Sequence, residues 1–299
     1  MNKSATSSPR FWLHAIIVYA AALAVGVLAT NPLTGYAHSQ AASYASDAAH
    51  QTAAATSLIE LRTAQVLDPG NPAYRQQLAD RYVARGNLSQ AVAVLGATSD
   101  ERIRKGQLLI RLGRASEAVA AVQGLAGTDA AITRSQAYLE EGRAGESQAA
   151  VTNPSNDAAL IQLALADAAD GNTTAVGPLI PQADSPDTQQ QLRRIQSGGL
   201  TLAQELYASG LYQAATRVLT AVPDSSAKSV LQAHLWLSRQ PLTHQDLTAA
   251  QAAATQGLRL DPASLPLHSL LQDIDSQLGD QDGAAHEQQL IGQLQSGKI

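Results

Sequence analysis

The chain has 299 residues, a formal charge of −5 and no cysteine, and only 4% of its residues are aromatic. The negative charge argues against a nucleic-acid partner, because phosphate binding needs a basic face. The lack of cysteine excludes disulfides, thiol nucleophiles and thiolate metal sites.

A 20-residue uncharged segment follows a short polar stretch at the start of the chain. Residues 1–10 contain Lys3 and Arg10, residues 11–30 carry no formal charge, and the next charge is Asp47. Twenty helical residues span about 30 Å, the thickness of the hydrocarbon layer of a bilayer. We therefore expect residues 1–10 in the cytoplasm, a single transmembrane signal-anchor helix at 11–30, and the remaining chain on the outer side of the cell membrane.

Cleavage of this segment as a signal peptide is the alternative. Its apolar part would be residues 15–26, followed by the small-residue pair Val27 and Ala29 or the pair Gly35 and Ala37. Export has the same direction in both cases. Residues 31–55, rich in alanine and serine and without apolar periodicity, are expected to be a spacer.

Beyond the spacer, a helical pattern stops at a glycine six times, and a small side chain follows five residues later. The pairs are Gly86/Ala91, Gly113/Ala118, Gly142/Ser147, Gly171/Val176, Gly210/Ala215 and Gly279/Ala284. A glycine just after a helix adopts the left-handed conformation of a tight turn, and a small residue in the next helix allows close backbone approach. The recurrence predicts a repeat of helical hairpins, hence an all-α fold.

The best copy is NPAYRQQLADRYVARGNLSQAVAVL, which resembles the tetratricopeptide repeat. The matching positions are Leu78, Ala79, Tyr82, Gly86, Ala91 and Leu95. The segments 66–72 and 258–266 are similar to the proline-containing turns that connect one repeat of this family to the next. The resemblance implies antiparallel helix pairs stacked in a right-handed superhelix over residues 56–295, and a function in binding other proteins.

The successive glycines of the pairs lie 27, 29, 29, 39 and 69 residues apart, whereas the family repeats about every 34 residues. The last interval leaves room for another helix pair, 226–239 and 245–260. An irregular bundle of hairpins that share a glycine turn is the alternative arrangement.

In this family the first helix of each pair lines the concave face, which implies a candidate partner-binding surface. Six residues before the glycine stand four polar side chains, called here the glutamine ladder: Asp80, Gln107, Gln136 and Gln204. One turn later come Arg111 and Glu140, and Tyr207 lies in the corresponding turn. Amides donate and accept hydrogen bonds, which suits an extended peptide or a polar polymer. Ordinary solvated helix positions are the competing explanation.

Positive charges are concentrated at five positions within thirteen residues, called here the basic patch: Arg102, Arg104, Lys105, Arg111 and Arg114. Such a cluster suits an acidic partner or anionic lipid headgroups, although solvated helix faces also contain such runs.

Catalysis and metal binding are not expected. The seven histidines form no HExxH pattern, and there is no phosphate-binding loop or nucleophile elbow. The adjacent residues Glu140 and Glu141 point about 100° apart on a helix and are expected to be solvated. A lytic transglycosylase would need a further lysozyme-like domain, for which no segment is left.

The sequence thus predicts a membrane-anchored, extracytoplasmic scaffold for protein–protein interactions, without a cofactor, that supports an envelope or secretion complex. The alternative is a secreted or periplasmic peptide- or glycan-binding module after signal cleavage.

Overall fold

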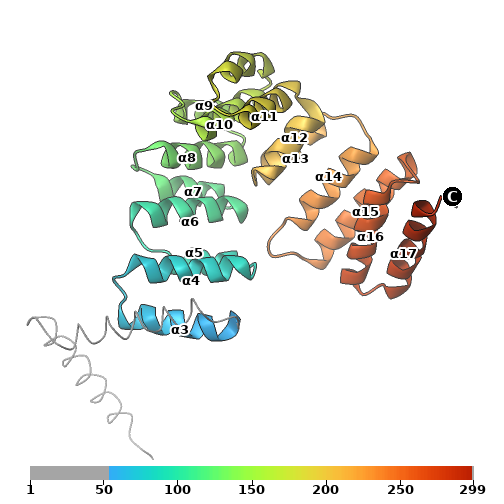
Figure 1. Cartoon of the computed structure of the whole chain (residues 1–299), viewed down its shortest axis with the longest axis horizontal. Helices are drawn as coiled ribbons and strands as arrows, with labels where there is room; N and C mark the ends of the chain where they lie inside the picture. The colour runs from blue at the N-terminus through green and yellow to red at the C-terminus, as the bar shows by residue number, and fades with distance from the viewer. Residues whose placement is uncertain (1–53, 298–299) are drawn as a thin grey trace, which may run out of the picture. The chain divides into compact units, whose positions relative to one another are not determined.

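The computed structural model describes residues 54–297, and every regular element in this range is a helix (Figure 1). The expected cytoplasmic segment 1–10, the anchor 11–30 and nearly all of the spacer lie outside the described residues. Within them, no helix is long and apolar enough to cross a bilayer. The chain divides between Thr98 and Ser99 into two compact units.

The first unit contains α3 (Ala54–Leu67), α4 (Pro72–Ala84) and α5 (Leu88–Val94). Asn71 caps α4: its side-chain oxygen accepts a hydrogen bond of 3.0 Å from the backbone N–H of Ala73. The buried Tyr82 hydroxyl accepts a hydrogen bond of 2.8 Å from Nε of Arg62, which joins α3 to α4.

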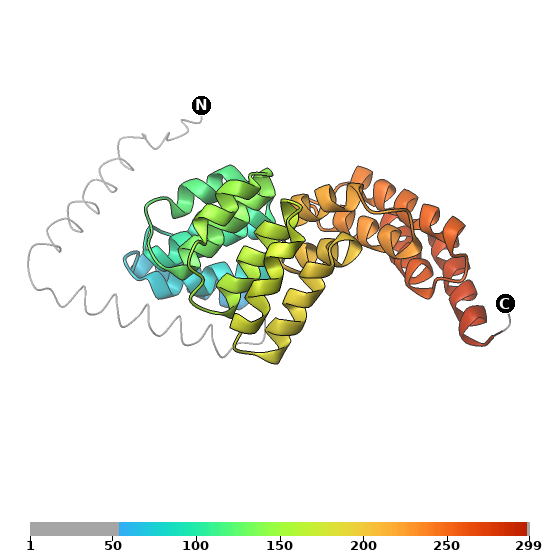
Figure 2. The ribbon, with the colours of Figure 1, turned by 90° about the horizontal axis from the view of Figure 1, so that it is seen from above.

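The second unit is a succession of antiparallel helices, each packed on its neighbours in the chain. They are α6 (Ser99–Arg111), α7 (Ala115–Val122), α8 (Thr128–Glu141), α9 (Ala144–Ala150), α10 (Asp157–Ala169), the 3₁₀ helix η1 (Thr173–Gln182), α11 (Pro186–Ser197), α12 (Gly199–Ala208), α13 (Tyr212–Thr220), α14 (Ser226–Leu237), α15 (His244–Leu260), α16 (Leu265–Leu278) and α17 (Gln281–Gln295). Figures 1 and 2 show α14 to α17, in orange to red, as four neighbouring antiparallel helices.

The predicted hairpin turns are confirmed in both units. All six glycines have a positive φ, from 71° at Gly113 to 86° at Gly171. The small residues that follow them are buried, with exposed fractions of 0% for five and 7% for Ala284. The helix pair expected in the last interval is also present, as α14 and α15. The all-α prediction is therefore correct, and the hairpin repeat describes these residues better than an irregular bundle does.

The 39-residue interval contains an element that the repeat pattern does not predict. The second helix of the fourth hairpin is the 3₁₀ helix η1, which contains Pro178 and Pro181. Proline has no N–H to donate and disfavours an α-helix interior. The extra helix α11 follows; Ser185 caps it by accepting a hydrogen bond of 3.0 Å from the N–H of Thr188.

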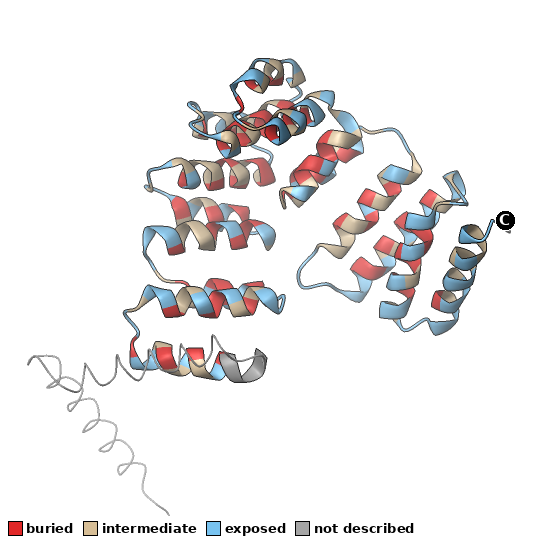
Figure 3. Cartoon of the chain, viewed as in Figure 1, coloured by how far each residue is buried: buried red, intermediate tan, exposed pale blue. Residues whose placement is uncertain are grey.

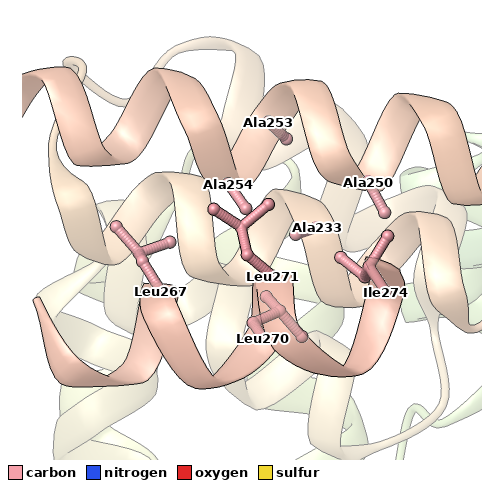
Figure 4. Packing of buried hydrophobic residues seen from close by; sticks show 8 residues of the cluster. All are labelled: Ala233, Ala250, Ala253, Ala254, Leu267, Leu270, Leu271 and Ile274. Carbon is pink, nitrogen blue, oxygen red and sulfur yellow. The ribbon is translucent and has the colours of Figure 1, made fainter. Parts of the chain in front are cut away.

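The last hairpins enclose an aliphatic cluster of eight buried residues (Figure 4): Ala233, Ala250, Ala253, Ala254, Leu267, Leu270, Leu271 and Ile274. Gly257 brings helices together here, since a Cβ on it would lie 2.6 Å from Cβ of Ser229 on α14. The terminal helix α17 is mostly exposed (Figure 3), and Ala284 is its buried residue.

Candidate functional site

The structure does not arrange the glutamine ladder as a continuous row. Asp80 is exposed on α4 of the first unit, and Gln107 and Gln204 are exposed on α6 and α12 of the second. Gln136 is half-buried on α8. On α10, the equivalent position six residues before Gly171 is Leu165, whose side chain is 1% exposed. A buried leucine therefore interrupts the row between Gln136 and Gln204.

Glu140 corrects a sequence prediction, because its side chain is buried rather than solvated. The carboxylate is 5% exposed and accepts backbone N–H hydrogen bonds of 3.1 Å from Gln213 and 3.1 Å from Ala214. These N–H groups belong to the first turn of α13, 73 residues further along the chain. Helix N-termini have free N–H donors and favour negative charge, so Glu140 caps α13. Burial raises the pKa of Glu140, against the lowering effect of the two N–H groups and Arg217.

Arg217 on α13 completes a reciprocal contact between α13 and α8. Its guanidinium donates to the backbone carbonyl of Glu140 at 3.1 Å and also to that of Leu139. These carbonyls lie in the last turn of α8, where positive charge is favourable. Each helix thus caps the other, and this contact connects two hairpins that are not neighbours in the chain. We call it the α8–α13 clasp.

The five side chains of the basic patch have different environments. Arg102 donates to the carbonyls of Ala121 at 2.8 Å and Gln123 at 2.7 Å, at the end of α7. Arg114 forms two hydrogen bonds of 2.6 Å with Glu117. Arg104 and Lys105 are half-buried on α6.

Arg111 differs from these neighbours. It is exposed, and among residues 54–297 no hydrogen bond or ion pair engages its guanidinium. Its side chain lies against the turn between α12 and α13, because a Cβ on Gly210 would be 3.9 Å from Cγ of Arg111.

Arg111 opens onto a groove with a volume of about 680 Å³ in the second unit, called here the polar groove. The end of α6 and residues of α8 and α13 line it together with α14, the α14–α15 loop and α15. Its polar side chains include Gln213, Thr216, Gln232, Arg239 and Gln256. Of the predicted partner-binding residues, Arg111 and Glu140 line this groove, whereas the ladder residues and Tyr207 do not.

Tyr207 lies among neighbouring helices. Its ring is 5.5 Å from that of Tyr212 on α13 and 6.2 Å from that of His234 on α14. Its hydroxyl oxygen accepts a hydrogen bond of 3.3 Å from Ser238. Tyr207 therefore supports the packing of α12 against α13 and α14.

Two side chains of the polar groove, Trp236 and Arg239, are stacked. The Arg239 guanidinium lies 3.8 Å from the centre of the indole ring of Trp236, and it also contacts Asp246 at 3.3 Å. Thr243 caps α15, and Asp246 completes this capping box by accepting hydrogen bonds from the backbone N–H and the hydroxyl of Thr243, which lower the pKa of Asp246. Trp236 also packs against the aliphatic cluster of the last hairpins. The sequence reasoning missed this stacked pair, although Trp236 and Arg239 stand only three residues apart in the sequence.

Other residues of α13 line a second cavity, the apolar pocket, of about 600 Å³. Its wall contains Ala168 and Leu200 together with Ala214, Val218 and Val222. Within residues 54–297, no group of three or more histidine or acidic side chains is placed to hold a metal ion.

No known protein-family profile and no curated protein sequence matches this chain. Among solved structures, it is similar to a tetratricopeptide repeat protein from Parabacteroides merdae ATCC 43184, with 13% identity over 80% of this chain and 99% of the other, at a TM-score of 0.46. It is also similar to the tetratricopeptide domain of P58(IPK), with 12% identity, coverage of 85% and 92% and a TM-score of 0.26. A third is the Cut9–Hcn1 hetero-tetramer of APC/C, with 10% identity, coverage of 83% and 64% and a TM-score of 0.33.

The helices and glycine turns described above make the chain a helical-hairpin repeat protein, and it resembles the tetratricopeptide repeat family, as its sequence predicts. This likeness concerns the course of the helices, and it assigns no role to any side chain. The interpretation of the site therefore rests on the contacts described above.

Proposed function

We propose that this protein is an interaction scaffold that binds a segment of another protein in the polar groove. One observation carries the proposal: the groove is lined by hydrogen-bonding side chains that the fold leaves free. Among the described residues, no hydrogen bond engages the side-chain amides of Gln213, Gln232 and Gln256. Each amide can donate to and accept from the backbone of an extended peptide.

Binding of a glycan is the second candidate, because it also uses amides and an aromatic ring. A sugar usually stacks its apolar face on an open aromatic ring. In this groove Arg239 covers Trp236, and the ring also packs against the aliphatic cluster. The groove therefore offers a sugar no free indole face, which favours a peptide segment.

Photo-crosslinking tests whether the groove binds a protein. A photoreactive residue at Gln232 should give a discrete cross-linked product with another protein in the native host, since Gln232 lies in the groove and is exposed. The same residue at Gln204, exposed on α12 outside the groove, is the matched control. A cross-linked product at Gln204 and none at Gln232 would contradict binding in the polar groove and support binding at the glutamine ladder.

We further propose that residues 11–30 anchor the scaffold, with its helical repeats outside the cytoplasm, where it supports an envelope or secretion complex. Support comes from the sequence: the uncharged segment is long enough to span a bilayer, and Lys3 and Arg10 precede it. Release as a periplasmic or secreted module after cleavage is the alternative. A reporter fused after Ile299 should be active outside the cytoplasm alone, and the mass of the mature chain separates the anchored from the cleaved form.

A further inference from the structure

The carboxylates that line the polar groove are already engaged by the fold. Glu140 accepts two backbone N–H groups of α13. Asp246 accepts the N–H of Thr243 at 3.1 Å and its hydroxyl at 2.6 Å. Asp224 accepts a hydrogen bond of 3.0 Å from Lys228. Of these three carboxylates, Asp224 keeps the most unused acceptor capacity, since its side chain is 65% exposed and, among the described residues, only Lys228 forms a hydrogen bond with it.

Its positive groups are engaged unequally. Lys228 donates to Asp224 and, at 2.6 Å, to the carbonyl of Val222. Arg239 contacts Asp246 through Nη1, so its other N–H groups have no partner among the described residues. Arg111 has none at all in the same range. Most of the free hydrogen-bond donors of charged groups in this groove therefore belong to these two guanidinium groups.

The two arginine side chains are ordered by different contacts, Arg111 along its aliphatic stem and Arg239 at its guanidinium. Arg111 lies against the α12–α13 turn at Gly210, and Arg239 is stacked on Trp236. A guanidinium binds a carboxylate through two parallel hydrogen bonds, and prior ordering of the side chain reduces the entropy lost on binding. The last residue of α6 and the loop between α14 and α15 therefore each present a guanidinium donor to the groove.

We infer that the polar groove selects an acidic segment of a partner protein, whose carboxylates pair with Arg111 and Arg239. This inference rests on the proposed function of the groove and adds the chemistry of the partner. Carboxylate side chains complement the guanidinium of Arg111 and the remaining N–H groups of Arg239, while the free amides of Gln213, Gln232 and Gln256 bind the peptide backbone. A basic segment would meet the unpaired guanidinium of Arg111 and the remaining N–H groups of Arg239, while Glu140 and Asp246 are already engaged.

A random twelve-residue peptide display library tests this selection on the full chain in detergent micelles. Recovered peptides should be enriched in aspartate and glutamate relative to the starting library. Arg111→Gln should weaken the recovered acidic peptide at least about tenfold, the effect of losing one charge-assisted pair. Arg111 is exposed and unpaired, so its replacement should leave the unfolding midpoint unchanged. Arg193→Gln, an exposed arginine on α11 outside the groove, is the control and should bind normally.

The outcomes separate this inference from the proposed function. Recovery of no peptide would overturn both. Peptides without acidic enrichment, or acidic peptides that bind Arg111→Gln as well as the unmodified chain, would overturn the acidic partner and leave the peptide groove intact. A last experiment measures binding of the chain to vesicles that contain phosphatidylserine. Binding to them that depends on Arg111, without acidic peptide binding, would identify a lipid surface instead and also overturn the inference.

Discussion

Two parts of the second unit share the hairpin geometry but fill it with different chemistry. From α14 to α16 the buried contact is aliphatic, and the side chains of Ala254, Leu267 and Ile274 are each 0% exposed (Figure 4). Between α8 and α10 it is polar. The hydroxyls of Ser135 and Ser147 are 2.6 Å apart, and Gln162 donates to Ser135 at 3.0 Å. A glycine turn and a small residue therefore define the hairpin, while the core chemistry varies.

The difference separates two sources of stability. Aliphatic packing is non-directional, whereas a buried polar network is stable only when its members meet their hydrogen-bond partners. The polar region also contains the α8–α13 clasp, which joins non-neighbouring hairpins. We expect substitutions in the clasp to have the largest effects on stability, and the following predictions test this order.

Glu140→Ala should have the largest effect, lowering the free energy of unfolding by about 2–3 kcal/mol. It leaves the N–H groups of Gln213 and Ala214 without an acceptor in a buried site. Glu141→Ala is the matched control. Glu141 pairs with Arg143 at 2.8 Å near the surface, and such pairs contribute about 1 kcal/mol or less. Denaturant unfolding of both variants provides the measurement, and equal effects would contradict a structural role of the clasp.

A pair of identical substitutions on α15 and α17 tests the close helix contact of the aliphatic region. Gly257→Ala should destabilise by about 1–3 kcal/mol, because the new Cβ would collide with Ser229 and Leu267. Gly292→Ala should instead stabilise by about 0.5–1 kcal/mol, since a Cβ there meets nothing within 4 Å on an exposed helix. Thermal melts of the two proteins should shift in opposite directions.

Ser147→Ala should cost about 1 kcal/mol, less than the clasp substitution. It removes the hydrogen bond to Ser135, but Gln162 still donates to the remaining hydroxyl. Alanine occupies the equivalent position in four other hairpins, so the packing volume is suitable. Ser116→Ala, at an exposed position of α7, is the control and should be neutral. A loss as large as that of Glu140→Ala would show that the polar network, rather than the clasp, dominates this region.

The smallest expected effect is a pH dependence at the terminal hairpin. His268 is 5% exposed, with Nδ1 2.5 Å from Glu287 on α17 and Nε2 2.9 Å from the carbonyl of Pro262. Burial lowers the pKa of His268, but the hydrogen bonds to these acceptors outweigh it and raise the pKa above 6.5. The folded protein thus holds this proton more tightly than the unfolded chain does.

The resulting stabilisation should be complete below pH 6.5 and should be lost as the pH rises through the folded pKa of His268. Unfolding measured at several pH values above 6 should therefore show falling stability in the unmodified chain. His268→Gln should lose this slope, whereas His286→Gln, an exposed position on α17, should keep it. A slope that persists in His268→Gln would assign the pH dependence to another group.

The repeat architecture could be predicted because its signals are local. A glycine with positive φ and a small residue five positions later define one turn and one contact, and the pattern located Gly86, Gly142 and Gly279 correctly. The extra helix α11 was missed, although Ser185 and Pro186 form a helix-start signal. The long interval that contains them was not interpreted as an additional helix.

The site was harder to predict because it depends on contacts between distant residues. Nothing near Glu140 in the sequence indicates that α13 lies against it, 73 residues later. Without that contact, Glu140 is indistinguishable from a solvated glutamate. The interruption of the glutamine ladder could not be predicted for the same reason, since periodicity does not show that Leu165 is buried between polar positions. Partner binding by the ladder residues stays a prediction. Arg111 was a candidate in both predicted surfaces, the concave face and the basic patch. Of the three candidates placed in the turn after the glutamine ladder, it is the one that is exposed and lines the polar groove.

Single cysteines test most directly whether the polar groove, rather than the ladder, binds the partner. The chain has no cysteine, so one introduced thiol is the only thiol to react. Alkylation would be timed for Gln232→Cys in the groove and Gln204→Cys on the ladder, each with and without the recovered peptide at saturation. We predict that the peptide slows the reaction at position 232 and leaves that at position 204 unchanged. Protection at 204 with an unchanged rate at 232 would contradict the account.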